Sequence, residues 1–418
     1  MLESRKNNLK TFALADTNTT KLNTLKMKKV LFALSALAMV ACTSKQQCQL
    51  PLADKANFAK EVDGKQVELF TLKNDAGMTA QITNYGGRIV NLFVPDKDGQ
   101  FQDVVMGFDN LDQYLTSGDG LYFGALIGRY GNRIGGASFK IGEETFNVDA
   151  NERRNSLHGG KKGYFAVVWD GKQLNDSTLE LSYLSADGEA GFPGNLNVKV
   201  VYTITKCNAI KIEYFAETDK PTVCNLTNHS FFNLSGDAST SINDHILMIN
   251  ADKYTPVDWS LIPTGELASL DNTPLDFRTP TAVGERIDSV RGGYDHNYVL
   301  IDSAKCCKSG LTLAAWVKSP VSGITMKVLT NEPGLQFYAG NFISGKETGK
   351  YGKLYPRRGA LCLETQHFPD SPNKENFPSV VLNPGEKYYS VCVYAFSNKD
   401  CCKEGEKCCK EGDKECEK

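Results

Sequence analysis

One acid and two histidines are the residues of this chain best suited to chemistry. Glu364 lies in the string L-E-T-Q-H-F-P-D-S-P-N, His229 lies in N-H-S-F-F-N-L-S-G, and His158 lies in N-S-L-H-G-G. Histidine transfers protons readily because its unperturbed pKa, roughly 6.5, is close to neutral pH. A carboxylate can serve as the matching base. These residues therefore predict proton transfer on a polar, uncharged ligand.

Each of these residues also has a structural alternative. A carboxylate in a strand is often only a solvated side chain, and a core histidine often bonds to the backbone. A metal site is another alternative, but no two histidines have the H-x-x-x-H or H-x-H spacing that presents two ligands from one element. The sequence also lacks a G-x-S-x-G elbow and a Rossmann glycine run. We therefore expect no metal and no cofactor.

Further polar residues could hold the hydroxyl groups of such a ligand. Strand alternation in T-N-H-S-F-F-N-L places Phe231 and Asn233 on the face of His229, which suits a sugar. The string I-G-R-Y-G-N-R-I-G-G places Arg129 and Arg133 four residues apart, and an arginine fork binds two oxygen atoms at once. The alternative for either arginine is a solvated position in a turn.

Three more strings carry residues of this kind. The paired glycines after His158 permit positive φ and a close ligand approach, although they also suit a plain turn. Asp295, in G-G-Y-D-H-N-Y, could bind hydroxyls, orient a histidine or simply stabilise a turn. Gln336, in N-E-P-G-L-Q-F-Y-A-G-N, begins a predicted strand beside two aromatic residues.

Strands must position these side chains, because apolar residues recur at every second position from Phe58 to Phe396. The segments 198–205 and 209–217 flank a Lys-Cys-Asn turn and predict a hairpin. Helical periodicity is confined to a short turn near 111–115. No proline-rich or serine-rich linker and no repeat divides the span, so one large all-β domain is predicted. Other strands are expected at 67–72, 78–84, 89–95, 324–330, 335–340 and 388–396.

The two ends of the chain differ from this domain. Residues 27–42 read M-K-K-V-L-F-A-L-S-A-L-A-M-V-A-C, a basic start followed by an apolar run too short to span a bilayer. This resembles a lipoprotein signal with Cys42 as the lipidated residue, and an ordinary secretory signal or a buried strand is the alternative. The protein is then expected in the envelope of a Gram-negative-type bacterium, in the periplasm or at the outer membrane, with the lipid as its only membrane contact. We expect residues 1–26 to be a non-native extension before a true start at Met27, and residues 27–42 to be the signal. Residues 43–63 are expected to form a tether or a first edge strand. The domain is expected at 64–398, followed by a disordered tail rich in Cys, Lys and Glu at 399–418.

Charge and cysteine content limit the partners. Lysine plus arginine, 47, nearly balances aspartate plus glutamate, 49, so no overall field attracts nucleic acid. We expect a monomer, with a dimer as the alternative. The 13 cysteines do not form an evident disulfide scaffold, and metal capture by the tail lacks a C-x-x-C or histidine partner. Four single cysteines in strand-like segments are expected to pack as small apolar side chains, namely Cys207, Cys224, Cys362 and Cys392.

The strings, in this order, resemble those of the galactose mutarotase family, also called aldose 1-epimerases. The resemblance covers almost all of 58–396. It implies a single large antiparallel β-sandwich with the sugar in an open cleft. It rests on nine strings, namely N-Y-G-G-R-I-V, I-G-R-Y-G-N-R-I, S-L-H-G-G, G-F-P-G-N-L, N-H-S-F-F-N-L, L-D-F-R, D-H-N-Y, E-P-G-L-Q-F-Y and L-E-T-Q-H-F-P-D-S-P-N.

The resemblance also implies an activity. The family interconverts the α and β anomers of free aldohexoses such as glucose and galactose, and it needs no cofactor for this. By position, Glu364 matches the general base and His229 matches the general acid. The positions that hold substrate hydroxyls match Asn132, Arg133, His158, Asp295 and Gln336.

Three alternatives remain at this stage. A hexose-6-phosphate 1-epimerase would need an additional basic cluster for the phosphate. A non-catalytic carbohydrate-binding lipoprotein would keep the aromatic residues and lose the acid or the base. In the third, the cysteine-rich tail is the functional part and the domain is a scaffold.

Overall fold

The computed structural model describes residues 51–116, 121–301 and 310–398. The predicted upstream extension, the signal segment with Cys42 and the tail 399–418 lie outside the described residues, so those expectations stay predictions. Within the described ranges, no helix combines the length and the apolar character needed to cross a bilayer.

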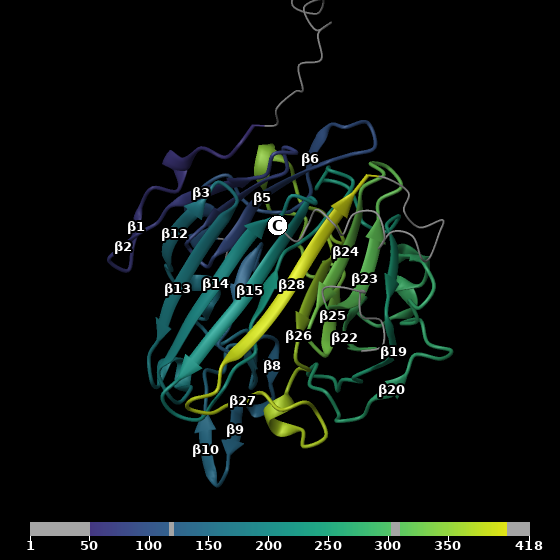
Figure 1. Cartoon of the computed structure of the whole chain (residues 1–418). Coiled ribbons are helices and arrows are strands. Elements are labelled where there is room, and N and C mark those ends of the chain that lie inside the picture. The colour runs from purple at the N-terminus through teal and green to yellow at the C-terminus, as the bar shows by residue number, and fades with distance from the viewer. Residues whose placement is uncertain (1–50, 117–120, 302–309, 399–418) are drawn as a thin grey trace, which may run out of the picture. The chain divides into compact units, whose positions relative to one another are not determined.

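A nine-stranded antiparallel sheet is the largest element of the domain, and Figure 1 shows β28 at its centre between β15 and β24. Apolar side chains at every second position make these strands, because alternate residues of a strand face the same side. In β15, the side chains of Ile210, Ile212 and Tyr214 are buried while those between them are partly exposed. In order across the sheet the strands are β12 (Asp170–Asn175), β13 (Thr178–Ser185), β14 (Leu196–Ile204), β15 (Ala209–Thr218), β28 (Tyr388–Ser397), β24 (Thr325–Thr330), β23 (Thr312–Lys318), β18 (Ile246–Ile249) and β21 (Thr281–Ala282).

Two smaller antiparallel sheets pack against the large one. Side chains from all three sheets, such as Ile82, Val198 and Phe337, share one hydrophobic core. The four-stranded sheet consists of β3 (Leu69–Lys73), β4 (Thr79–Thr83), β5 (Arg88–Pro95) and β6 (Phe101–Asp103). The five-stranded sheet consists of β20 (Ala268–Ser269), β19 (Ala251–Tyr254), β22 (Asp295–Leu300), β25 (Gly334–Tyr338) and β26 (Cys362–Gln366).

Buried tyrosines of the large sheet also bond across the core. The Tyr202 hydroxyl donates to the carbonyl of Gly87, and the Tyr394 hydroxyl donates to the carbonyl of Leu363 on β26. These bonds satisfy the polar end of each ring inside an apolar environment. The predicted all-β antiparallel sandwich is therefore confirmed.

The remaining elements are short. The helix expected near 111–115 is present as α2 (Leu111–Thr116). The short strands are β1 (Glu61–Val62), β2 (Lys65–Gln66), β7 (Ala125–Ile127), β8 (Arg133–Ile134), β9 (Ser138–Ile141), β10 (Glu144–Asn147), β11 (Ser156–Leu157), β16 (Thr222–Val223), β17 (Thr227–His229) and β27 (Val381–Leu382). The 3-10 turns are η1 (Lys55–Asn57), η2 (Gly135–Ala137), η3 (Tyr164–Ala166), η4 (Glu189–Gly191), η5 (Val283–Glu285), η6 (Ile287–Ser289), η8 (Lys350–Gly352) and η9 (Ser371–Asn373).

The folded unit includes residues that the sequence assigned to a tether. Phe58 is fully buried, and the backbone of Ala53 exchanges two hydrogen bonds with the Gln81 side chain. The alternative expectation of a first edge strand has a counterpart in β1, which pairs with β2. Residues 51–63 therefore pack on the domain, because the Phe58 side chain is buried in a hydrophobic cluster of its core.

One cysteine differs from its predicted role. The hairpin of β14 and β15 is confirmed, but Cys207 in its turn is exposed and disulfide-bonded rather than packed as an apolar side chain. Its position at the tip of the hairpin explains this, since a turn of this kind has no core to enter. The other three, Cys224, Cys362 and Cys392, are free and buried as expected.

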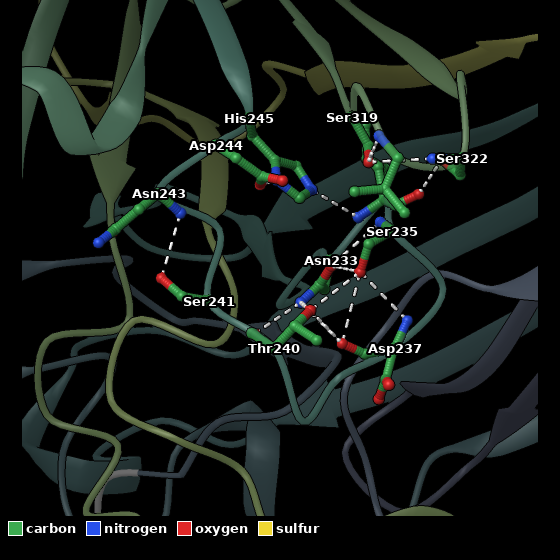
Figure 2. Close-up of polar contacts among 12 residues, drawn as sticks. Asn233, Ser235, Asp237, Thr240, Ser241, Asn243, Asp244, His245, Ser319 and Ser322 are labelled. Atoms are coloured by element: carbon green, nitrogen blue, oxygen red, sulfur yellow. Dashed lines mark hydrogen bonds and ion pairs between the residues drawn. The ribbon is translucent and has the colours of Figure 1, made fainter.

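The loop between β17 and β18 is held by its own side chains (Figure 2). The Asn233 amide donates to the carbonyls of Thr240 and Gly359, and its oxygen accepts from Ser235. The buried His245 accepts a hydrogen bond from the backbone N–H of Leu234 at 3.0 Å. Asn233 is therefore committed to the loop and does not stand beside a ligand with His229, contrary to the sequence expectation.

Candidate active site

A pocket of about 250 Å³ opens where the five-stranded sheet meets the short strands β8, β11 and β17. It contains the two residues expected to be catalytic and the five that match sugar-binding positions of the family, but not Arg129 or Asn233. Glu152 and several aromatic and apolar side chains complete its wall. The seven predicted residues in its lining are Asn132, Arg133, His158, His229, Asp295, Gln336 and Glu364.

Strand register explains why residues distant in sequence meet here. β25 pairs with β26 so that Gln336 lies opposite Glu364, and β22 pairs with β25 so that Asp295 lies opposite Tyr338. Opposite residues on neighbouring strands project to the same face. Three segments remote in sequence thus present their polar side chains to one cavity.

The expected acid and base, His229 and Glu364, lie next to each other. The Nε2 atom of His229 lies 3.6 Å from Oε1 of Glu364, and both side chains are almost completely buried. Within the described part of the chain, His229 Nδ1 and Glu364 Oε2 find no hydrogen-bond partner. Buried polar atoms without partners are costly, so such atoms are expected to bond to a ligand.

Burial sets the protonation of this pair. It raises the pKa of the Glu364 carboxyl well above its ordinary value, and the nearby charge of Asp295 raises it further, while Arg133 acts in the opposite direction. Burial lowers the pKa of His229 to about 3. The carboxyl therefore holds a proton more tightly than the imidazole does, so the pair with one proton is a neutral carboxyl beside a neutral imidazole.

His158 is fixed in a single tautomer. Its Nδ1 accepts a hydrogen bond from the backbone N–H of Asn132 at 3.2 Å, so the proton of the neutral ring is on Nε2. Burial keeps the pKa of His158 well below its usual value, so the ring stays neutral. It is thus equipped to donate one hydrogen bond.

The backbone around this histidine lies in an uncommon conformation. Asn132 has φ of 63° and His158 has φ of 54°, and such values cluster at functional sites. The adjacent Gly159 has φ of 87°, and a Cβ there would lie 2.0 Å from the carbonyl oxygen of Gly128. The positive φ that the sequence allowed after His158 is therefore confirmed, and the close neighbour on that side is the backbone of Gly128 rather than a ligand.

Three of these groups could be considered as metal ligands. Each of His158, His229 and Glu364 offers one ligand atom, and these three atoms lie within 4.8 Å of one another. A metal needs a lone pair on the histidine nitrogen that faces it, and the other nitrogen then donates to an acceptor. In His158 the lone pair instead faces a backbone N–H donor. The arrangement therefore fits proton transfer better than metal binding.

Two polar pairs line the rest of the pocket. The Gln336 amide donates to Asp295 Oδ1 at 2.7 Å, and its own oxygen has no partner among the described residues. The Arg133 guanidinium donates from Nε and Nη2 to the two carboxylate oxygens of Glu152, each at 2.8 Å. Sequence reasoning did not identify Glu152, since an acid in the polar run N-E-R-R-N carries no signal of its partner.

Aromatic rings form the apolar wall. Phe231 stacks on His229 with centroids 4.8 Å apart, which confirms the predicted ring beside this imidazole. Tyr122 contacts His158 edge-on at 4.6 Å, and nothing in its local sequence indicated this position. Phe342 lines the pocket although 70% of its surface is exposed. Such rings suit the apolar face of a sugar.

Arg129 does not belong to the pocket. Its side chain is buried, and its guanidinium donates to the backbone carbonyls of Ser185, Pro193 and Gly194. The two arginines of I-G-R-Y-G-N-R-I thus have different roles, and only Arg133 reaches the pocket.

The other three histidines have structural partners. His245 accepts from the backbone of Leu234, as described above. The His296 ring accepts from the backbone N–H of Asp295, and His367 lies 2.6 Å from a carboxylate oxygen of Glu332. Of these three, only His245 is a fully buried histidine with a backbone bond, while His296 and His367 are partly buried.

An all-β domain with a buried carboxyl–imidazole pair in a polar and aromatic pocket has the features of an enzyme that moves protons on an uncharged ligand. Comparison with known proteins agrees. The family model for aldose 1-epimerase matches residues 68–395. Galactose mutarotase of Homo sapiens is 42% identical over 335 residues, which cover 80% of this chain and 95% of that protein.

Two further relatives extend this similarity. Aldose 1-epimerase of Escherichia coli strain K12 is 37% identical over 341 residues, which cover 80% of this chain and 96% of that protein. The crystal structure of an aldose epimerase homologue from C. elegans has a TM-score of 0.72 at 29% identity, covering 79% of this chain and 99% of that one. The chain belongs to the aldose 1-epimerase family, and it is an isomerase.

Proposed function

We propose that this protein is an aldose 1-epimerase that interconverts the α and β anomers of free aldohexoses such as glucose and galactose. Glu364 is the general base and His229 is the general acid. The observation that carries this assignment is the buried pair at 3.6 Å, in which each residue keeps one polar atom without a protein partner. A sugar has the two oxygen atoms that such a pair needs, the anomeric hydroxyl and the ring oxygen.

The reaction proceeds through the open-chain sugar. Glu364 takes the proton of the anomeric hydroxyl while His229 donates a proton to the ring oxygen, so the bond between C1 and the ring oxygen breaks and an aldehyde forms. Rotation about the C1–C2 bond exposes the other face of the carbonyl. The ring then closes as the other anomer, and the proton transfers are reversed.

The pair can do this without exchanging protons with the solvent. It holds one proton in its resting form and one in its reactive form, in which Glu364 is the anion and His229 the cation. The two forms have the same net charge, so moving the proton between them avoids burying an uncompensated charge. Hydrogen bonds from the sugar hydroxyls favour the charged form, because they solvate both groups.

The other polar side chains hold the sugar. Arg133 and His158 donate to hydroxyl oxygens from one side of the pocket. Asn132 supports both, because its backbone N–H donates to His158 and its side-chain oxygen accepts from the backbone N–H of Arg133. Asp295 and Gln336 form a bonded pair on the other side and accept from hydroxyls. Stacked rings cover the apolar face.

Two alternatives receive less support. A phosphorylated hexose would need uncompensated cations, but Arg133 is the one basic side chain other than histidine in the described lining of the pocket, and Glu152 already pairs with it. A non-catalytic sugar-binding protein has no need for a buried acid–base pair, because burial without partners weakens stability.

We also propose that Cys42 carries the lipid that anchors the protein in the cell envelope, and that the protein acts as a monomer. The short apolar run before Cys42 supports the first proposal.

Polarimetry on freshly dissolved α-glucose tests the assignment. Glu364→Gln should bind sugar but lose about three orders of magnitude of the rate above the solvent reaction, since an amide cannot take the proton. Glu143→Gln, in an exposed turn, serves as the control. Full activity in Glu364→Gln would remove Glu364 as the base, and a wild-type rate equal to the solvent rate would remove the proposed function.

A further inference from the structure

Glu152 lines the pocket but belongs to none of the strings that match the family, and its carboxylate accepts two hydrogen bonds from the Arg133 guanidinium. Both contacts are 2.8 Å long, and the arginine side chain is 8% exposed while that of Glu152 is 30% exposed. A two-point contact of this kind fixes the plane of a guanidinium, which a single bond does not.

A tight turn holds Glu152 in place. The backbones of Glu152 and Asn155 exchange two hydrogen bonds, of 3.1 and 2.9 Å, around the turn residues Arg153 and Arg154. The guanidinium groups of Arg153 and Arg154 lie over the ring of Trp259, at 5.9 and 5.6 Å from its centroid. The turn is thus anchored at its tip as well as at its base.

The base of the turn is tied to the strands of the pocket. The side-chain oxygen of Asn155 accepts from the backbone N–H of Gly136, just after β8, and β8 begins with Arg133. Ser156 follows directly in β11, which pairs with β8. Backbone contacts of the protein itself therefore place Glu152 next to Arg133.

The two hydrogen bonds to Glu152 determine which N–H groups of Arg133 remain to face the sugar. A guanidinium has five N–H groups, and Glu152 takes one on Nε and one on Nη2. Within the described part of the chain, Nη1 makes no protein hydrogen bond that competes with a ligand, and the arginine lines the pocket. The Nη1 edge is thus left for substrate oxygens.

We propose that Glu152 is a positioning residue for sugar recognition, which acts by orienting the free edge of Arg133 and by offsetting its charge in the pocket. This inference rests on the proposed function, because Arg133 must bind the sugar for its orientation to matter. It makes Glu152 a determinant of affinity for the uncharged substrate, and not of the proton transfers.

The test compares Glu152→Gln and Glu152→Asp with the exposed control Glu143→Gln, using polarimetry over a range of glucose and galactose concentrations. Gln keeps the size but replaces one acceptor with a donor that opposes the guanidinium. Its KM should rise about ten-fold while kcat changes less than about two-fold. Asp keeps both acceptors on a shorter stem and should recover part of the lost affinity.

A merely structural role predicts a different pattern. A loss of kcat in step with a lower melting temperature, with KM unchanged and no recovery by Asp, would overturn the inference. An unchanged KM in Glu152→Gln would do the same. Either result leaves the proposed function intact as long as the wild-type protein accelerates mutarotation, so the two failures are distinguishable.

Discussion

At the scale of single residues, the site depends on how burial changes the chemistry of a common pair of side chains. In water the carboxyl loses its proton at a lower pH than the imidazolium does, so between the two pKa values an anion stands beside a cation. Here burial raises the pKa of Glu364 and lowers that of His229 to about 3. The order of the two ionisations is therefore reversed.

This reversal predicts the pH profile of kcat/KM. The pair must hold one proton, so activity is lost when the pH falls through the lowered pKa of His229 and when it rises through the raised pKa of Glu364. We expect a bell whose acid limb lies well below pH 6.5, toward about 3. Initial rates in overlapping buffers measure it, with circular dichroism as the control for folding. An acid limb near pH 6.5 would contradict the reversal.

At the scale of elements, loops are held in place because buried polar side chains satisfy their backbone groups. Arg129 donates to carbonyls of the segments around Ser185 and Pro193. In the loop after β17, Asn233 donates to a carbonyl and His245 accepts from a backbone N–H. Each such side chain replaces the hydrogen bonds that a strand ladder would supply. The sequence marks these residues as polar but not as structural.

Arg129→Met should therefore lower the free energy of unfolding by about 3 kcal/mol, because it leaves several buried carbonyls without a donor. Arg129→Lys should not restore it, since an ammonium lacks the planar set of five donors. Chemical denaturation measures the change, and Arg291→Met, at an exposed position, is the matched control. Equal stability of Arg129→Met and Arg291→Met would refute this role.

At the scale of the whole molecule, three sheets share one core, and the site lies where the five-stranded sheet meets the short strands β8, β11 and β17. The proposed catalytic pair comes from β17 and β26, which are separated by more than a hundred residues and belong to different sheets. The residues that line the pocket lie between 122 and 364, and the predicted signal segment 27–42 is distant from them in sequence.

The proposed lipid anchor belongs to this scale. Cys42→Ser should abolish incorporation of a radiolabelled or clickable fatty acid and move the protein from the detergent phase to the aqueous phase in a cloud-point separation, because a lipid chain contributes roughly 0.8 kcal/mol for each buried methylene. Cys48→Ser, six residues away, is the control. Retained label in Cys42→Ser would refute the assignment.

Sequence alone determined the all-β class, the positions of eight strands and, through the resemblance of its strings to the aldose 1-epimerase family, seven residues that line the pocket. It could do so because strand periodicity is local, and because the strings around Glu364, His229 and His158 combine residue types that few structural roles require together.

Only the tertiary structure decided which polar residues meet. Arg129 binds loop carbonyls outside the pocket, whereas Arg133 lines the pocket and bonds to Glu152. Asn233 supports a loop, and Cys207 lies at an exposed hairpin tip. Burial in the tertiary structure also reversed the order in which the proposed catalytic pair ionises. The physical reason is the same in each case, because hydrogen-bond partners and burial are sums over neighbours that are distant in the chain, and no local pattern records them.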